Sequence, residues 1–270
     1  MKSCEGYLIC SDFDGTFFHK TIPQNNITAV NEFMARGGHF TFCTGRRGDV
    51  FKQICVDFKP NVPLIGMGGG QIYDIDSDRS LKQVFFGPEL IPLVRDFMRE
   101  YHGVRTIRLD FIDHSEYFMP DDTVLIKDYF TREVSYVKDR TPLSRLTFEE
   151  CPPVYKVVVS LDFTNAESMP TQGKMLCSGR CNPIANDWKY IELMPFGFDK
   201  GTAALELKKM TGDHTLIAIG DFLGDIPLLK TADIGYAVEN ALPEVKRAAD
   251  RLTVHVDQGA VDAIIKPLLE

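Results

Sequence analysis

The chain has 270 residues, 44% hydrophobic and 25% charged, the composition of a globular protein with one large domain or two smaller ones. Its net charge of −8 argues against a nucleic-acid or anionic-membrane binder, because basic residues are not in excess. No window approaches the roughly 18 consecutive apolar residues of a membrane span. The N-terminus does not resemble a secretory signal, and the seven scattered cysteines lack a zinc pattern, so we predict reduced thiols and a cytoplasmic location.

Buried strands and amphipathic helices alternate from the N-terminus. The apolar run at residues 7–12 predicts a strand, residues 23–38 show helical spacing and end on two glycines, and residues 39–45 predict another strand. A helix at 49–58 and a strand at 62–69 follow. Because helices of about ten to fifteen residues separate these strands, we expect right-handed crossovers and a parallel sheet.

The same alternation resumes from about residue 198, after a stretch of different texture. The C-terminal part predicts helices at 199–212, 225–232, 242–250 and 259–270, and strands at 214–220, 233–238 and 251–254. The intervening stretch, richer in prolines, aromatics and charged loops, predicts strands at 104–111 and 155–163 and helices at 89–103 and 166–176. The sequence therefore predicts a doubly wound, Rossmann-like α/β core formed by residues 1–83 and 187–270, with an inserted α+β domain at 84–186.

Four short motifs fall at predicted strand ends or helix starts of the core: residues 12–16, 44–46, 200–201 and 220–225. In an open parallel sheet such positions face one crevice, so aspartates from distant parts of the chain should meet there. Carboxylate oxygens are what Mg²⁺ requires, and the metal would offset the repulsion between Asp12 and Asp14. Asp14-Gly15 is also a hairpin signal, but a helical stretch rather than a returning strand follows it.

In order and spacing, these motifs resemble the haloacid dehalogenase (HAD) superfamily of phosphotransferases. The place of the insertion resembles that of Cof-like phosphatases with a type IIB cap. The resemblance covers nearly the whole chain and implies a Mg²⁺-dependent phosphatase for a small phosphomonoester, such as a sugar phosphate, nucleotide or phosphorylated cofactor. It also implies that Asp12 is a nucleophile that forms an aspartyl-phosphate, and that Asp14 is the general acid and base whose backbone carbonyl binds the metal.

The resemblance assigns the remaining site residues as well. Asp221 would be a direct metal ligand and Asp225 would complete or orient the metal site, although both also fit the first turn of a helix. Thr44 and the Gly45 amide would hold the transferring phosphoryl oxygens, and Lys200 would neutralise them. Two further candidates for substrate or phosphate binding are Arg46, which also fits a solvated surface position, and Asn240, which also fits a helix cap.

Two positions depart from the family pattern. Gly224 stands where an asparagine is usual, and residues 66–74 lack the usual Asn-Gly after the third strand. Neither change alters the predicted nucleophile, acid or lysine, so we expect catalysis to survive.

The inserted domain is expected to close over the crevice, exclude bulk water and select the leaving group. We expect a small phosphorylated metabolite as partner, no nucleic acid or membrane, and a monomer or weak homodimer. Two other functions stay open: a phosphomutase, and a receiver-like module in which phosphorylated Asp12 is a signal. Sequence does not choose among the cap residues that could face substrate: Arg105, Arg108, Tyr117, Asn186 and Trp188.

Overall fold

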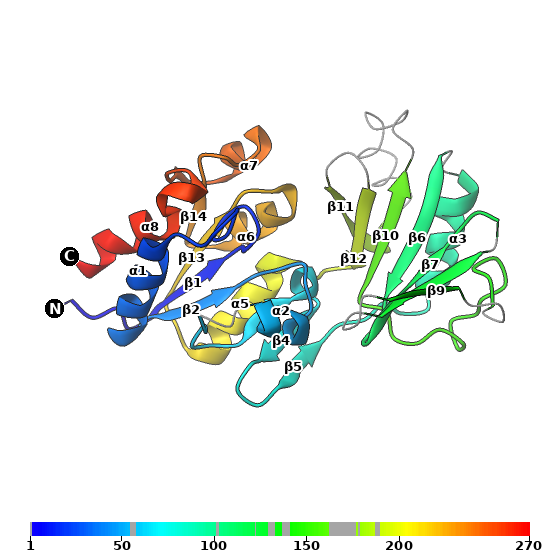
Figure 1. Cartoon of the computed structure of the whole chain (residues 1–270), viewed down its shortest axis with the longest axis horizontal. Helices are drawn as coiled ribbons and strands as arrows, with labels where there is room; N and C mark the ends of the chain where they lie inside the picture. The colour runs from blue at the N-terminus through cyan, green and yellow to red at the C-terminus, as the bar shows by residue number, and fades with distance from the viewer. Residues whose placement is uncertain are drawn as a thin grey trace. The chain divides into compact units, whose positions relative to one another are not determined.

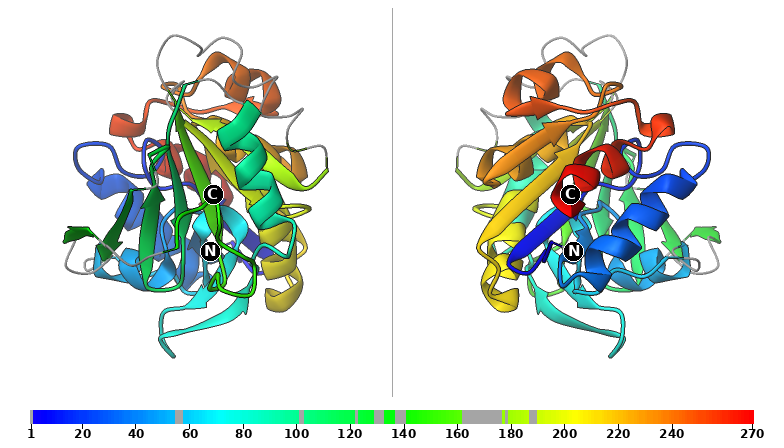
Figure 2. Two further views of the ribbon diagram at one scale, coloured as in Figure 1. Left: turned by 90° about the vertical axis from the view of Figure 1, so that its right-hand side faces the viewer. Right: turned by 90° about the vertical axis from the view of Figure 1, so that its left-hand side faces the viewer.

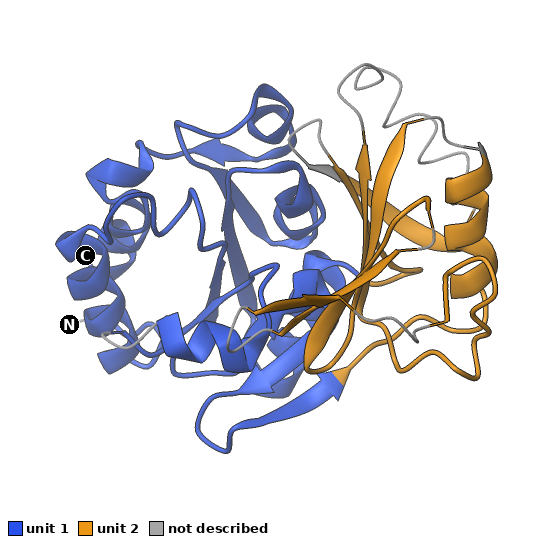
Figure 3. Cartoon of the chain, turned by 45° about the vertical axis from the view of Figure 1, so that its right-hand side comes forward, with its two compact units in different colours: residues 1–82, 199–270 blue, residues 83–198 orange. Residues whose placement is uncertain are grey.

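The computed structural model of this chain describes residues 2–54, 58–100, 103–121, 123–128, 133–136, 141–161, 177, 179–186 and 190–270. The chain divides into two compact units, which Figure 3 colours separately. Unit 1 comprises residues 1–82 and 199–270, and unit 2 comprises residues 83–198. Within the described residues, no helix combines the length and the apolar character that crossing a membrane requires.

Unit 1 contains a parallel five-stranded sheet in the order β15-β14-β13-β1-β2 (Figure 1). Its strands are Tyr7–Ser11 (β1), His39–Phe42 (β2), Thr215–Gly220 (β13), Ile234–Ala237 (β14) and Arg251–Leu252 (β15). In β1 and β13, every residue after the first is buried. Both faces of these central strands are covered, which is why their sequences are continuous apolar runs rather than alternating ones.

Helices cover both faces of this sheet. They are Gln24–Ala35 (α1), Gly48–Ile54 (α2), Lys200–Thr211 (α5), Ile226–Thr231 (α6), Pro243–Ala248 (α7) and Ala260–Leu269 (α8). The connections β1–α1–β2 and β13–α6–β14 run in opposite directions along the sheet, so right-handed crossovers place α1 and α6 on opposite faces. Helix α8 lies beside α1, and α5 lies beside α6 (Figures 1 and 2).

A small three-stranded sheet, β3-β4-β5, extends unit 1. Its strands are Leu64–Gly66 (β3), Gln71–Asp74 (β4) and Arg79–Gln83 (β5), and the short 3₁₀ turn Met67–Gly69 (η1) follows β3. An isolated parallel bridge between Cys43 and Ile65 attaches β3 to the end of β2. The Gly68 N–H donates to the Thr44 carbonyl at 3.0 Å, so η1 is fixed beside the carboxyl end of β2.

Unit 2 is built on an antiparallel seven-stranded sheet in the order β11-β12-β10-β6-β7-β8-β9. The strands are Val104–Asp110 (β6), His114–Phe118 (β7), Val124–Asp128 (β8), Val134–Tyr136 (β9), Lys156–Leu161 (β10), Cys181–Asn186 (β11) and Tyr190–Pro195 (β12). Helix Leu90–Glu100 (α3) contributes Leu90, Val94 and Phe97 to a separate hydrophobic core that includes one face of this sheet.

The predicted fold class, a doubly wound parallel core with an inserted α+β domain, is confirmed. The end of the second unit differs from the prediction, because it falls at residue 198 and not at 186. The reason is strand β12, which pairs with β10 and β11 and buries Ile191 and Leu193 in the core of unit 2. The helix predicted at 166–176 lies outside the described residues.

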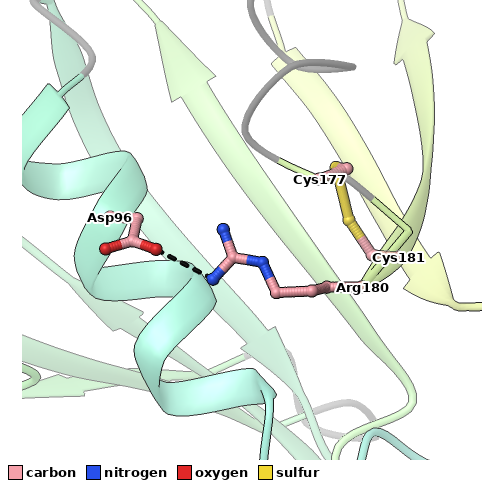
Figure 4. Close-up of a disulfide and its surroundings, with 4 residues drawn as sticks. All are labelled: Asp96, Cys177, Arg180 and Cys181. Carbon is pink, nitrogen blue, oxygen red and sulfur yellow. Dashed lines mark hydrogen bonds and ion pairs between the residues drawn. A yellow bond between two sulfur atoms is a disulfide. The ribbon is translucent and has the colours of Figure 1, made fainter.

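The prediction that the cysteines are reduced is wrong for two of them. A disulfide joins Cys177 and Cys181, whose Cα atoms are 5.3 Å apart, inside the usual range for such bonds (Figure 4). Between them in sequence, Arg180 donates to Asp96 of α3 at 2.8 Å. Sequence could not reveal the bond, because a spacing of four residues fits two separate buried thiols equally well. Cys55 lies outside the described residues, and the thiols of Cys4, Cys10 and Cys43 are free and buried.

Candidate active site

Asp12 follows β1 directly, at the carboxyl edge of the parallel sheet. Ser11, the last residue of β1, is in register with Ile219 of β13, and the Asp12 N–H donates to the Ile219 carbonyl at 2.9 Å. Asp221 follows the end of β13 at the same edge. The loops after β1 and β13 therefore begin side by side, as the parallel topology requires.

The segment after Asp12 folds into a tight turn, in which the Gly15 N–H donates to the Phe18 carbonyl at 2.7 Å. Because β1 pairs with the parallel strands β2 and β13, this turn is local and the hairpin alternative is wrong. Gly15 has φ +90°, and a Cβ there would lie 2.4 Å from Oδ2 of Asp221. Thr16 donates its hydroxyl to Oδ1 of Asp221 at 2.7 Å. The turn thus requires glycine at position 15 and holds the Asp221 carboxylate.

Lys200 is the first residue of α5, and its side chain reaches two carboxylates. Its Nζ lies 2.6 Å from Oδ1 of Asp12 and 2.6 Å from Oδ1 of Asp225. The helix starts at this residue because the preceding Asp199 is its N-cap, whose side chain accepts from the Thr202 N–H at 2.8 Å. The cap therefore makes Lys200 the first residue of the helix, and so fixes the point from which its side chain extends to the two carboxylates.

The glycine-rich turn η1 packs against the start of α5. A Cβ on Gly69 would lie 2.2 Å from the carbonyl oxygen of Asp199 and 2.9 Å from the backbone nitrogen of Lys200. The Met67 N–H donates to the Arg46 carbonyl at 2.8 Å, which joins the same turn to the loop after β2. Position 69 therefore requires glycine, because only glycine permits this approach.

Asp225 is buried and uses both carboxylate oxygens. Oδ1 is bound to Lys200, and Oδ2 accepts from the N–H groups of Asp221 at 3.1 Å and Phe222 at 3.0 Å. Asp225 is the last residue of the 3₁₀ turn Leu223–Asp225 (η3), so its side chain folds back onto the start of the loop. These contacts orient both Lys200 and the backbone that carries Asp221.

We call Asp12, Lys200, Asp221 and Asp225 the acidic cluster. Burial and the charges of Asp225 and Asp221 raise the pKa of Asp12 well above its usual range, although Lys200 opposes the shift. Burial and Asp225 raise the pKa of Asp221 to about 6. Burial disfavours the charged form of Lys200, but Asp12 and Asp225 outweigh it and raise the lysine pKa. The cluster contains three carboxyl groups and only one ammonium group. A further positive charge would therefore stabilise the ionised form of the carboxyl groups.

The acidic cluster fits a divalent cation. One oxygen from each of Asp12, Asp221 and Asp225 lies within 4.8 Å of the others, and the described residues contain no other group of this kind. A donor set made only of carboxylate oxygens suits Mg²⁺, and a bound cation would favour the ionised form of all three. The residues present therefore fit the metal that the sequence predicts.

Thr44 and Arg46 lie on the loop after β2. Thr44 is buried, and its Oγ1 accepts from the Arg46 N–H at 3.2 Å, whereas Gly45 is exposed. The Arg46 guanidinium binds the Asp14 carboxylate through two hydrogen bonds, of 3.0 and 2.8 Å. The Asp14 carboxylate therefore binds Arg46 and is not a member of the acidic cluster. Arg46 forms an ion pair and is not only solvated.

Asn240 joins two backbone segments. Its Nδ2 donates to the Gly15 carbonyl at 2.7 Å, and its Oδ1 accepts from the Val256 N–H at 3.0 Å. The helix-cap alternative is wrong, because Leu242 is the N-cap of α7. Phosphate binding by Asn240 stays a prediction, and the contacts present connect the Gly15 turn with the 3₁₀ turn Val256–Gln258 (η4).

Sequence reasoning missed the contact of Thr16 and the steric requirement at Gly69. The available signal for Thr16 was its place in the motif at residues 12–16. For Gly69 it was the run of three glycines after β3, which matches no regular strand.

The haloacid dehalogenase-like hydrolases match residues 9–265 of this sequence. The chain belongs to this family. A sugar phosphatase of HAD subclass IIB, BT4131, has a similar structure, with a TM-score of 0.70 over 97% of this chain and 98% of that one at 17% identity. The predicted superfamily, the type IIB architecture and the enzyme class are therefore confirmed.

Curated relatives of this HAD hydrolase are phosphatases. The 5-amino-6-(5-phospho-D-ribitylamino)uracil phosphatase YwtE of Bacillus subtilis is 23% identical over 97% of both chains. Phosphoglycolate phosphatase 2 of Saccharolobus solfataricus is 38% identical over 78 residues, 28% of this chain and 34% of that protein. The second match thus spans about a third of the relative's length.

Proposed function

We propose that this HAD hydrolase is a Mg²⁺-dependent phosphatase that cleaves small phosphomonoesters through an aspartyl-phosphate on Asp12. The observation that carries the proposal is the placement of the buried Asp12 carboxylate, 2.6 Å from Lys200 Nζ and in one cluster with Asp221 and Asp225. A buried lysine beside a carboxylate can neutralise a phosphoryl group that approaches that carboxylate.

In the proposed first step, an oxygen of Asp12 attacks phosphorus, the ester P–O bond breaks, and Asp14 gives a proton to the leaving oxygen. In the second step, water gives a proton to Asp14 and attacks the phosphorus of the aspartyl-phosphate, which releases inorganic phosphate and restores the Asp12 carboxylate. Asp14 is bound to Arg46 in the free protein. Its role therefore requires Arg46 to leave Asp14, and we assign Arg46 to the phosphoryl oxygens of the substrate.

The remaining residues of the site bind or neutralise the phosphoryl oxygens and orient the groups that do so. Thr44 and the Gly45 amide bind phosphoryl oxygens, and Lys200 neutralises them. Bound Mg²⁺ would supply positive charge beside the transferring phosphoryl group, held by Asp12, Asp221 and the Asp14 carbonyl. Asp225 orients Lys200 and the Asp221 backbone, as its hydrogen bonds support.

We assign recognition of the leaving group to unit 2, and expect a small phosphorylated metabolite as substrate. The relatives' names support this class, since they describe phosphatases of a ribitylamino compound and of phosphoglycolate. A cytoplasmic location and a monomer or weak homodimer stay part of the proposal. The buried thiols of Cys4, Cys10 and Cys43 support the location, whereas the Cys177–Cys181 disulfide does not.

A phosphate-release screen tests the function. The full chain is incubated with p-nitrophenyl phosphate, sugar and sugar-alcohol phosphates, nucleoside monophosphates and 2-phosphoglycolate, in Mg²⁺ or in EDTA. We expect free phosphate from at least one ester in Mg²⁺ and none in EDTA. Release from no ester would overturn the phosphatase proposal, and conversion of an ester to its isomer with little free phosphate would indicate a mutase.

The stabilisation of the protein by Mg²⁺ is expected to depend on pH. The pKa of Asp221 is raised to about 6 in the folded, metal-free protein, so above that pH its ionised carboxylate destabilises the fold relative to the protonated form. Mg²⁺ needs the ionised form. The rise in melting temperature on adding Mg²⁺ should therefore be small at about pH 5 and large at about pH 8, with the change centred near pH 6.

Thermal unfolding in Mg²⁺ and in EDTA across this pH range measures the effect. Ca²⁺ at the same concentration serves as a comparison, because it uses oxygen ligands but tolerates a wider site. A Mg²⁺-induced shift that is equal at both ends of the range, or larger in acid, would contradict the assignment of Asp221 as a ligand.

A further inference from the structure

The loop that follows β14 contacts both other loops of the metal site. Strand β13 separates β14 from β1, yet the amide of Asn240 reaches the turn after β1, where its Nδ2 donates to the Gly15 carbonyl at 2.7 Å. Two residues later, the Leu242 N–H donates to the Asp221 carbonyl at 3.1 Å. One loop therefore holds the backbone of the segments after β1 and after β13.

These two segments carry groups that we assign to Mg²⁺, the Asp14 carbonyl and the Asp221 carboxylate. The Asp14 carbonyl belongs to the peptide that joins Asp14 to Gly15. The same turn lies against the Asp221 carboxylate, because Thr16 donates to its Oδ1 at 2.7 Å and a Cβ on Gly15 would lie 2.4 Å from its Oδ2. A shift of the Gly15 turn would therefore displace both groups.

The other polar atom of the Asn240 amide is bound to a buried part of the fold. Its Oδ1 accepts from the N–H of Val256 at 3.0 Å, and Val256 is only 1% exposed. Val256 begins η4, which also contacts α1, since the Asn25 amide donates to the Gln258 carbonyl at 3.2 Å. Asn240 thus connects the Gly15 turn to a support that other contacts hold in place.

A second contact joins the segment after β1 to η4, but it is exposed. Nδ1 of His19 lies 3.1 Å from Oδ1 of Asp257, and the two side chains are 46% and 50% exposed. Even with a protonated imidazole, so exposed a pair contributes little and is screened by salt. We therefore assign the fixing of the Gly15 turn to the uncharged amide of Asn240.

Mg²⁺ is sensitive to the placement of its ligands. It requires nearly octahedral coordination, whereas Ca²⁺ accepts a more flexible arrangement and longer bonds. Removing a group that orients the ligands of a metal without touching the metal typically lowers the metal affinity by about 10- to 100-fold. Asn240 is placed to be such a group, because it binds the carbonyl one residue after that of Asp14.

We propose that Asn240 is a positioning residue for the metal. It holds the Gly15 turn, and with it the Asp14 carbonyl and the Asp221 carboxylate, in the arrangement that Mg²⁺ requires. This proposal rests on the metal assignment within the proposed function, and it gives Asn240 a role that needs no contact with the phosphoryl group.

Metal titrations test the proposal. The full chain is titrated with Mn²⁺, whose free form is measured by electron paramagnetic resonance, and Mg²⁺ or Ca²⁺ then competes for the site. We expect Asn240→Ala to raise the Kd for Mg²⁺ by at least about tenfold, and the Kd for Ca²⁺ by less. Asn240→Ser is a second variant, because its hydroxyl is too short to bind both backbone groups, and it should show the same loss. The Asn240 side chain is exposed, so water can replace its hydrogen bonds and both variants should fold.

Asn61→Ala is the matched control. Asn61 is also exposed, and its amide likewise joins two backbone groups, the Gly38 carbonyl and the Phe40 N–H, both at 2.9 Å. These groups lie at the amino end of β2, at the opposite edge of the sheet from the acidic cluster. This variant should bind both ions as tightly as the parent does.

Kinetics at saturating Mg²⁺ separate positioning of the metal from contact with substrate. If Asn240 acts through the metal site, saturating Mg²⁺ should bring KM for p-nitrophenyl phosphate close to the parent's value. An unchanged Kd for Mg²⁺ with a raised KM would show instead that Asn240 binds phosphate, and would overturn the proposal. Equal losses for Mg²⁺ and Ca²⁺, or an equal loss for Asn61→Ala, would overturn it as well, because they would indicate a general loosening of the fold.

The metal titration also distinguishes this proposal from the proposed function. The Kd values decide the role of Asn240 whether or not an ester is hydrolysed, so absence of hydrolysis by the parent would contradict the phosphatase function alone. A parent that binds no Mg²⁺ would contradict the metal assignment, and the positioning role of Asn240 with it.

Discussion

Replacing Asp12 by Asn is expected to lower phosphate release by at least about 10³-fold, because an amide cannot form the aspartyl-phosphate. The fold should tolerate the change. The amide removes a buried carboxylate whose pKa is raised by burial and by Asp225 and Asp221, although it also removes one partner of Lys200. The melting temperature in EDTA should therefore stay within about 4 °C of the parent's. The measurement is phosphate release from the best ester of the screen, beside thermal unfolding.

Asp213→Asn is the matched control for this substitution. Asp213 is also a buried carboxylate of unit 1, bound to His39 at 2.8 Å, and it lies outside the acidic cluster. This variant should keep most of the parent's turnover. If Asp12→Asn turned over as fast as the parent, Asp12 would not be the nucleophile.

Replacing Lys200 by Met is expected to destabilise the metal-free protein by about 3–5 kcal/mol at about pH 8, because Asp12 and Asp225 then lie buried without their cation. The raised pKa of Lys200 means that its stabilising contribution is complete below the unfolded value and is lost only as the pH rises through the folded one. The contribution is therefore fully present at pH 8. Without the lysine, the two carboxyl groups take up protons more readily, so the loss should shrink at about pH 5.

Urea unfolding in EDTA at the two pH values measures this loss. Lys208→Met is the matched control on the same helix, since Lys208 pairs with Asp233 at 2.7 Å through side chains that are 20% and 50% exposed. Partly exposed pairs contribute little, so this control should lose no more than about 1 kcal/mol. Equal losses for the two variants would show that Lys200 does not neutralise a buried charge. Lys200→Met should also lower turnover strongly, in parallel with Asp12→Asn.

The parallel core could be predicted because burial on both faces leaves a clear pattern. The sequences of β1 and β13 show no alternation of polar and apolar residues, which indicates strands buried on both faces. Parallel topology then predicts that both strands end at the same edge of the sheet. Unit 2 was harder. Only two of its strands, β6 and β10, were predicted, since strands such as β12 carry a charged residue, Glu192, on a face that is not a hydrophobic core.

In the candidate site, too, one part could be predicted from the sequence and another part could not. That Asp12, Lys200 and Asp221 approach one another could be predicted, because backbone topology places them there. The partners of individual side chains could not. The pairing of Arg46 with Asp14 and the hydroxyl contact of Thr16 depend on rotamers and loop geometry, which hydrophobic periodicity does not encode. The Cys177–Cys181 bond is of this kind as well.

The close approach of Gly69 to Asp199 limits how chimeras of this enzyme can be built. A donor segment with any side chain at position 69 would displace the N-cap of α5, and Lys200, the next residue, would move away from Asp12. Grafting the turn after β3 from another HAD hydrolase therefore requires grafting the start of α5 from the same donor. The two segments are distant in sequence, but for recombination they form one block.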